Sequence, residues 1–419
     1  MDSHEIRMIE FFSGIGGMRY GMEQALEAIN NAYQTTHRLS LCVAYDISLH
    51  ANRTYQYNNE RMFSSSEEKS PPNSTTCKLG GISTIIHTKL IEQLTSQDIK
   101  QYQANVWTLS PPCQPFTQRN NNVEHRRQRD DVVDPRNQAL LHICTTLLPS
   151  LQEHKPRWIF LENVQNFYNS TMYSIWCRTL INCGYTFVPY LLNPATSLGV
   201  PNNRTRFYMT CQLTSSNNVS HVQQPLQTAL IPNSCSNPTK EDNSIMEDTI
   251  NEHTLCPHST PPRKPLSRYL QLDSTEEEIA PYLLTHSQLQ QRWSTYLSIV
   301  TPADDITYCF TAGYSRILHK STGSVLLSHT PTTTTAISID KTNLLQYHGR
   351  IRRFTPKEIC NLLGFPKSFQ FPIDDIPLAQ QYKMIGNSIH VTLVAKLLEK
   401  LFLPSLDSGI NEVTQQQKT

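Results

Sequence analysis

One cysteine of this chain has a sequence setting that favours nucleophilic chemistry. Cys113 lies in the run SPPCQPF, directly after an apolar stretch that predicts a strand. The prolines restrict the backbone and end the strand, because proline cannot donate a ladder hydrogen bond. We therefore expect the thiol at a fixed point beyond the strand end, where nearby positive charge would favour the thiolate. Most cysteines are small buried hydrophobes, and we interpret the other cysteines in that way.

An acid and two arginines follow later in the chain. Glu162 comes after the apolar run WIFL, so partial burial would raise its pKa and make it a plausible proton donor. Arg204 and Arg206, in NNRTRFYM, are expected on one strand face, where they would hold an anion or orient Glu162. The alternatives are a helix-capping or salt-bridged acid and a solvated basic edge.

A glycine-rich turn near the N-terminus favours an adenosyl cofactor. Gly14, Gly16 and Gly17 in SGIGG let the backbone turn tightly and approach a ligand beside a helix N-terminus. Asp46, about thirty positions on, could accept hydrogen bonds from a ribose diol. The alternatives are a turn that is glycine-rich for packing and a solvated turn acid.

Alternating strands and helices position these residues. Apolar runs at 7–12, 39–46, 105–110 and 157–163 predict strands, and helices are expected from Met18, over 138–152 and over 174–184. This order predicts an α/β fold with a mostly parallel sheet covered on both faces. Ligands bind at the carboxyl ends of such strands, so the three motifs should meet in one crevice.

The remaining chain predicts a second unit and less ordered segments. Residues 58–81 indicate an exposed insertion, and 214–265, rich in Ser, Asn, Thr and Pro, are expected to be disordered. We expect a first catalytic part at 1–213, a target-recognition domain at 214–348, a closing catalytic part at 349–403 and a disordered tail at 404–419.

Composition limits the classes of function. The 419 residues carry a net charge of +1, so a nucleic-acid footprint would have to be local. No apolar run approaches the roughly 20 residues of a membrane helix, and no secretory signal is visible. Eleven cysteines without a CxxC pattern favour reduced thiols in the cytoplasm or nucleus and argue against a metal site.

Six segments resemble the cytosine-C5 methyltransferase family in order. FFSGIGGMRYGM resembles its cofactor loop, SPPCQPFTQR its nucleophile loop, FLENVQNF its ENV motif and GVPNNRTRFYM its arginine motif. RRFTPKEICNLLGFP and MIGNSIHVTLVAKLL resemble its closing pair. The resemblance implies a Rossmann-like sheet that binds S-adenosylmethionine, with a smaller target-recognition domain.

Within that family the chain is most similar to the Dnmt2 type of tRNA methyltransferase. The triplet Cys309, Phe310 and Thr311 matches the hallmark Cys-Phe-Thr of its recognition region. This implies methylation of cytosine 38 in the anticodon loop, with aspartate tRNA as the usual substrate and weak action on DNA left open. In one departure, the stretch KLGGIS has Gly80 where the family has an acid that contacts adenine.

The resemblance also implies roles for individual residues. Cys113 would attack cytosine C6 while Glu162 protonates or hydrogen-bonds N3, and Arg206, with Arg204 less firmly placed, would steady the base or Glu162. The cofactor would contact Phe12, Ser13, Gly14, Ile15, Gly16, Gly17, Met18, Asp46, Ile47, Pro111, Asn387 and Ser388. The substrate would contact Arg119, Arg126, Arg127, Cys309, Phe310 and Thr311.

Two other functions remain open at this point. A DNA cytosine-C5 methyltransferase would share every catalytic residue, although the Cys-Phe-Thr triplet and the short recognition region favour tRNA. A catalytically silent nucleic-acid-binding protein could keep the same fold, but the presence of Cys113, Glu162 and Arg206 weighs against it. The arginines at 119, 126 and 127 would bind phosphates or belong to a solvated mobile loop.

Overall fold

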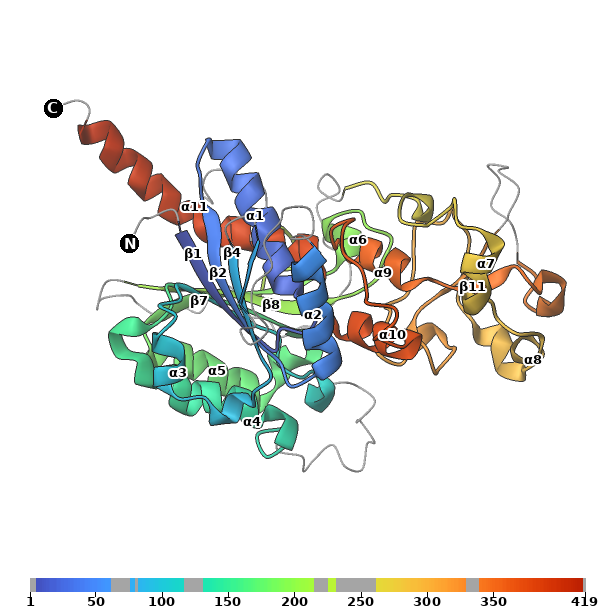
Figure 1. Ribbon diagram of the computed structural model, residues 1–419, viewed down its shortest axis with the longest axis horizontal. Coiled ribbons are helices and arrows are strands. Elements are labelled where there is room, and N and C mark those ends of the chain that lie inside the picture. The colour runs from blue at the N-terminus through green and yellow to red at the C-terminus, as the bar shows by residue number, and fades with distance from the viewer. Residues whose placement is uncertain are drawn as a thin grey trace, which may run out of the picture.

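The structure is a computed structural model that describes residues 5–61, 76–79, 82–116, 131–214, 225–230, 261–328 and 339–416. For 76–79 and 404–416 it describes the backbone alone. Within these residues the chain forms a large sheet flanked by helices and a smaller lobe with its own short sheet (Figure 1).

The large sheet has eight strands in the order β3-β4-β2-β1-β5-β6-β8-β7. Strands β4, β2, β1, β5 and β6 run parallel, whereas β3, β8 and β7 pair antiparallel with their neighbours. The predicted α/β fold with a mostly parallel sheet is therefore confirmed. The strands are β1 (Glu5–Phe11), β2 (Arg38–Tyr45), β3 (Thr76–Leu79), β4 (Ile82–His87), β5 (Val106–Leu109), β6 (Trp158–Val164), β7 (Tyr185–Leu192) and β8 (Arg206–Leu213).

Helices cover both faces of this sheet (Figure 1). Helices α1 and α11 pack together on one face, and α4 and α5 lie on the other. The helices are α1 (Gly17–Tyr33), α2 (Leu49–Arg61), α3 (Ser96–Lys100), α4 (Gln138–His142), α5 (Thr171–Asn182), α6 (Pro194–Ser197), α7 (Glu276–Ile279), α8 (His286–Leu289), α9 (Pro356–Leu362), α10 (Leu378–Asn387) and α11 (Val391–Gln416).

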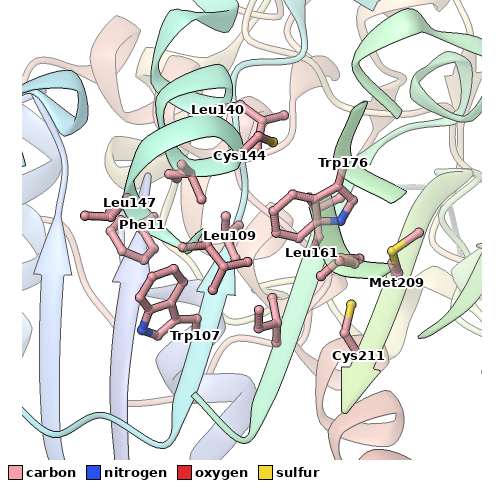
Figure 2. Packing of buried hydrophobic residues seen from close by; sticks show 14 of the residues in the cluster. Phe11, Trp107, Leu109, Leu140, Cys144, Leu147, Leu161, Trp176, Met209 and Cys211 are labelled. Atoms are coloured by element: carbon pink, nitrogen blue, oxygen red, sulfur yellow. The ribbon is translucent and has the colours of Figure 1, made fainter. Parts of the chain in front are cut away.

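Large buried side chains fix the strands that carry the motifs. Figure 2 shows Trp107 on β5 and Leu161 on β6 facing Leu140, Leu147 and Trp176 from the helical layer. All five side chains are fully buried. Burying one such side chain contributes roughly 1.5–3 kcal/mol, so the ends of β5 and β6 are held by a well-packed layer.

The predicted helix at 138–152 is broken in the structure. Helix α4 ends at His142 and continues as one wide turn, in which the Leu148 amide donates to the Ile143 carbonyl at 3.0 Å. Pro149 follows, and the chain then forms a tighter turn over Pro149–His154. Proline lacks the amide that regular helical bonding needs, which explains the break.

The smaller lobe contains β9 (Ile299–Val300), β10 (Val325–Leu327) and β11 (Ile351–Arg353). Because β11 pairs with β10, the short sheet includes Ile351–Arg353, and the boundary that the sequence predicts at 349 stays a prediction. An apolar cluster joins the lobes, and it includes Phe310 of the small lobe, Phe354, which follows β11, and Tyr20 of α1. The small lobe is therefore fixed to the large lobe at the start of α1.

Three segments differ from the sequence prediction. The tail expected to be disordered from 404 is helical to Gln416, as the end of α11, which extends beyond the sheet (Figure 1). The insertion expected at 58–81 is helical to Arg61 and includes β3. In the segment expected to be disordered at 214–265, residues 225–230 and 261–265 are placed by backbone contacts such as Lys264 N to Gly199 O at 2.9 Å.

Candidate active site

The carboxyl ends of β1, β5 and β6 lie side by side. Phe11 is level with Leu109, and Leu109 is level with Leu161. The residues that follow are joined by hydrogen bonds, because Ser110 Oγ donates to the Phe12 carbonyl at 2.9 Å. The structure thus brings the glycine loop, the Cys113 loop and the Glu162 strand end to one edge, as expected from their positions in the sequence.

Two asparagines hold the Cys113 loop. Asn163 Nδ2 donates to the Pro111 carbonyl at 3.3 Å, and Asn166 Nδ2 donates to the Phe116 carbonyl at 3.0 Å. The Phe116 amide closes the turn on the Cys113 carbonyl at 3.0 Å. The loop therefore keeps its shape through backbone carbonyls, and Asn163 is a positioning residue that sequence reasoning did not single out as a site residue.

The Cys113 thiol is partly exposed. Burial raises the pKa of Cys113, and the positive charge of Arg206 opposes this effect only in part. Glu162 raises the pKa further, while Arg204 lowers it. Ionisation of this thiol therefore depends on Arg206 and on what the substrate brings to the site.

Glu162 and Arg206 form a buried pair. Arg206 Nε lies 3.6 Å from Glu162 Oε1, and only 7% of Glu162 is exposed. Burial raises the pKa of Glu162, against the opposing charges of Arg206 and then Arg204. A carboxyl with a raised pKa can carry a proton near neutral pH and hand it to a base.

Arg204 does not share a strand face with Arg206, because β8 begins at Arg206. Arg204 is 2% exposed, and its guanidinium donates to the carbonyls of Phe310 at 2.9 Å, Gly386 at 3.2 Å and Ser388. It therefore ties the recognition region to the GNS turn. The alternative of a solvated basic edge does not apply to Arg204, since it is buried and both terminal nitrogens of its guanidinium donate to backbone carbonyls. Its expected catalytic role stays a prediction.

The Cys-Phe-Thr triplet lies directly against these arginines. Cys309 Sγ accepts from Arg204 Nη1 at 3.3 Å and from Arg206 Nη2 at 3.6 Å. Phe310 is 2% exposed and packs against Phe354, so its side chain belongs to the core, and its expected substrate contact stays a prediction. Thr311 is half-buried.

The GNS segment, Gly386 to Ser388, packs closely against the backbone of the Cys-Phe-Thr triplet. A Cβ on Gly386 would lie 2.2 Å from the backbone nitrogen of Ala312, so only glycine allows this approach. Asn387 is exposed at the end of α10, and Ser388 is half-buried beside the start of α1. Of the two predicted cofactor contacts, Ser388 therefore lies next to the glycine loop.

The glycine loop leaves room for a ligand at Gly14. A Cβ built on Gly14 would meet no atom within 4 Å, and the residue has a φ of 53°. Ser13 Oγ is buried without a hydrogen-bond partner among the described residues. An open backbone beside an orphaned hydroxyl fits a polar cofactor such as S-adenosylmethionine.

The other glycines serve packing. A Cβ on Gly16 would lie 2.9 Å from Tyr55, and one on Gly17 would lie 2.7 Å from Ile389. Ile15 and Met18 are buried in the core, so only their backbone could face a cofactor. Phe12, at a φ of 58°, is half-buried and packs on the core beneath the sheet.

Asp46 accepts hydrogen bonds from backbone amides, which the sequence did not predict. Its carboxylate accepts from the Gly14 amide at 2.9 Å and from the Ser48 amide at 2.7 Å. It therefore braces the glycine loop and keeps lone pairs free for a ribose. Ile47 beside it is 66% exposed, which leaves an apolar side chain at the mouth of this site.

The strand next to β2 ends away from the stretch that contains Gly80. Strand β4, which pairs parallel with β2, begins at Ile82 and ends at His87, so the stretch KLGGIS spans the end of β3 and the start of β4. The residue beside the cofactor edge is therefore His87. Its ring stacks on Tyr45 at 4.8 Å, and its Nε2 lies 2.9 Å from the Tyr102 hydroxyl. Gly80 itself lies outside the described residues.

A buried acid behind the glycine loop was also missed. Glu10 is 0% exposed, and it accepts from the Met18 amide at 3.2 Å and the Tyr55 hydroxyl at 2.9 Å. Burial raises the pKa of Glu10 to about 8. The available signal was an acid inside the apolar run RMIEFF.

The remaining expectations concern three arginines, a metal site and a membrane-spanning helix. Arg119, Arg126 and Arg127 lie outside the described residues. Within the described ranges, no group of three or more His, Cys, Asp or Glu side chains could hold a metal ion. In the same part of the chain, no helix combines the length and apolar character needed to span a membrane.

Known proteins resemble this chain over nearly its whole length. The tRNA (cytosine(38)-C(5))-methyltransferase of Homo sapiens is 30% identical over 95% of this chain and 99% of its own. The enzyme of that name from Schizosaccharomyces pombe is 27% identical over 96% of this chain and 99% of its own. The solved Entamoeba histolytica methyltransferase EhMeth has a TM-score of 0.66 at 26% identity, covering 95% of this chain and 98% of that one. Residues 6–403 match C-5 cytosine-specific DNA methylase, and the chain therefore belongs to this family of cytosine-C5 methyltransferases.

Proposed function

We propose that this protein methylates C5 of cytosine 38 in the anticodon loop of tRNA, with aspartate tRNA as its main substrate and S-adenosylmethionine as the methyl donor. The observation that carries the chemistry is the convergence of Cys113, Glu162 and Arg206 at one sheet edge. The choice of tRNA is supported by the near full-length similarity to relatives named for that reaction.

Cys113 is the nucleophile in this proposal. Cytosine C5 is a poor nucleophile, so the ring needs activation, and attack of the thiolate on C6 provides it. The thiol must lose its proton first, and the Arg206 charge favours the anion. Elimination of Cys113 after loss of the C5 proton then releases the methylated base.

Glu162 acts on the opposite side of the pyrimidine ring. As Cys113 attacks C6, electron density moves toward N3, and a protonated Glu162 can donate to that nitrogen. Its raised pKa keeps the proton available, and Arg206 holds the carboxyl in place from 3.6 Å. Arg204 acts indirectly, because it fixes the loop that carries Cys309 beside the same pair.

The cofactor would lie on the glycine loop. Ser13 and Gly14 would contact it by hydroxyl and backbone, Asp46 would accept from its ribose, and Ser388 and Ile47 would border it. When bound, S-adenosylmethionine supplies an electrophilic methyl group on a sulfonium. Hydrogen bonds of Asn163 and Ser110 fix the position of the Cys113 loop relative to the glycine loop.

The substrate base must leave its stack to reach Cys113. An unpaired loop cytosine costs less to extrude than a paired one, and RNA recognition favours unpaired bases. We propose that Cys309 and Thr311 border the extruded base and that Arg119, Arg126 and Arg127 contact the phosphates. Since these activities use reduced thiols, we also propose that the protein works in the cytoplasm or nucleus.

The matched family is described by DNA methylation, so DNA is the competing substrate. The experiment offers labelled S-adenosylmethionine with an aspartate tRNA transcript, the same tRNA with uridine at position 38, and a cytosine-containing duplex DNA. We expect label in the first tRNA alone. Preferential labelling of the duplex, or equal labelling of the uridine-38 tRNA, would contradict the proposal.

A further inference from the structure

Two thiols border the Glu162–Arg206 pair, and they differ in the charged groups that surround them. Cys113 follows β5, whereas Cys309 comes from the small lobe, and both interact electrostatically with Arg206. Both are partly exposed, in contrast to the other free cysteines of the described residues, which are buried. The two are therefore the accessible thiols of the described active site.

The donors around Cys309 favour an anionic sulfur. Arg204 Nη1 lies 3.3 Å and Arg206 Nη2 lies 3.6 Å from its Sγ, so two positively charged groups donate to one atom. A protonated thiol would have the Phe310 carbonyl at 3.7 Å as its acceptor, and that carbonyl already receives Arg204 at 2.9 Å. Fixed cations and donors of this kind stabilise a thiolate.

Electrostatics agree with this geometry. Burial raises the pKa of Cys309, but Arg204 and then Arg206 outweigh it and bring the pKa below the ordinary value. For Cys113, burial prevails over Arg206 and the pKa is raised. Glu162 faces the same guanidinium and adds negative charge on the Cys113 side.

We infer that Cys309 is an electrophile-sensitive modification site: in the enzyme without nucleic acid it is the ionised thiol of the active site, and it competes with Cys113 for the positive charge of Arg206. The reagent that modifies Cys309 is a soft electrophile, such as an alkyl halide or a peroxide. This assignment rests on contacts of Cys309 itself and stands whether or not tRNA is the substrate.

The chemistry needs no component beyond the electrophile. With iodoacetamide, the Cys309 sulfur donates an electron pair to the methylene carbon, a C–S bond forms, and iodide leaves. With hydrogen peroxide, the sulfur attacks one oxygen, the O–O bond breaks, and hydroxide leaves as the thiolate is oxidised to a sulfenic acid. Either product removes the anion between Arg204 and Arg206.

The competition has a second consequence. Cys309→Ala removes one negative group from beside Arg206 and leaves its charge to Cys113 and Glu162. The Cys113 thiol should then ionise at a lower pH than in the parent chain. A residue that merely filled space would not move the ionisation of a second thiol.

The test is brief alkylation of the full chain with iodoacetamide at a series of pH values, with modification of each cysteine measured by peptide mass spectrometry. We expect Cys309 to react several-fold faster than Cys113 at pH 7, with a midpoint below that of Cys113. Cys360, whose burial raises its pKa to about 12, is the unreactive internal reference. Faster reaction of Cys113, or equal midpoints, overturns the assignment.

Variants then show whether the reactivity of the two thiols depends on the charge of residue 206 or on packing. Arg206→Gln should raise the midpoint of Cys309, and Arg206→Lys should restore it in part. In Cys309→Ala the midpoint of Cys113 should fall, and an unchanged midpoint overturns the competition. The comparison of the two thiols in the parent chain needs no variant, so it decides the central point even if a variant fails to fold.

Discussion

Arg206 lies between two acidic groups: its Nε is 3.6 Å from Glu162 Oε1, and its Nη2 is 3.6 Å from Cys309 Sγ. One guanidinium thus joins the strand that carries the proposed proton donor to the lobe that carries the recognition triplet. Because Arg206 also lowers the pKa of Cys113, it influences three ionisable groups in one site.

The pH dependence of methylation should follow from this arrangement. Activity needs Cys113 ionised, so it falls at low pH, and it needs Glu162 protonated, so it falls at high pH. Arg206→Gln removes a charge that lowers both pKa values, so both limbs should move to higher pH and kcat should fall by roughly 100-fold. Arg206→Lys should return the limbs toward their original positions. An unshifted profile in Arg206→Gln, measured with labelled donor, contradicts this role.

Arg204 should matter for stability more than for proton transfer. Arg204→Met leaves the carbonyls of Phe310, Gly386 and Ser388 without a donor, which should cost about 3 kcal/mol of unfolding free energy. Arg53→Met is the control, because that arginine forms an exposed ion pair worth about 1 kcal/mol or less. Urea unfolding measures both, and equal losses in the two variants would refute the role of Arg204.

Gly14 offers a test of the cofactor site with a matched control. Gly14 and Gly349 both have positive φ, at 53° and 74°, and neither has an atom within 4 Å of a built Cβ. An alanine at either position should therefore cost about 1–2 kcal/mol of stability. Only Gly14→Ala should weaken S-adenosylmethionine binding, by roughly tenfold or more, as measured by calorimetry. Equal affinities for the two variants would place the cofactor elsewhere.

Buried Glu10 should make stability depend on pH. Its pKa is raised from 4.5 to about 8, so the folded chain binds a proton that the unfolded chain releases. The free energy of unfolding should therefore decrease as pH rises from 4.5 toward 8. Glu10→Gln should flatten this dependence, whereas Glu27→Gln, on the exposed side of α1, should keep it. Urea unfolding at a series of pH values measures this dependence. If the free energy of unfolding changes equally with pH in Glu10→Gln and in the parent chain, Glu10 is not its source.

Much of the large lobe could be predicted because its central strands are continuous apolar runs. β1, β2, β5 and β6 were located in this way, and Cys113 and Glu162 were predicted as a pair because both follow such runs. The strand next to β2 could not be located in this way, since β3 and β4 are short strands that pair antiparallel with each other.

Long-range partners explain the other differences. Arg204 contacts carbonyls of residues more than one hundred positions away, and no local pattern indicates which partners fold back onto it. The strands of the small lobe have two or three residues, too few for a period to be visible. Phe310 belongs to a hallmark triplet and yet is buried, because one motif can combine a packing residue with a site residue.

The central claim is that Cys113 attacks C6 of the target cytosine. The most direct measurement uses an aspartate tRNA with 5-fluorocytosine at position 38, incubated with S-adenosylmethionine and then digested for mass spectrometry. Fluorine at C5 blocks the proton loss that frees the cysteine, so the adduct should persist. We predict a nucleotide attached to the peptide that contains Cys113, and none in Cys113→Ala. An adduct on Cys309, or a methylated product without any adduct, would contradict the account.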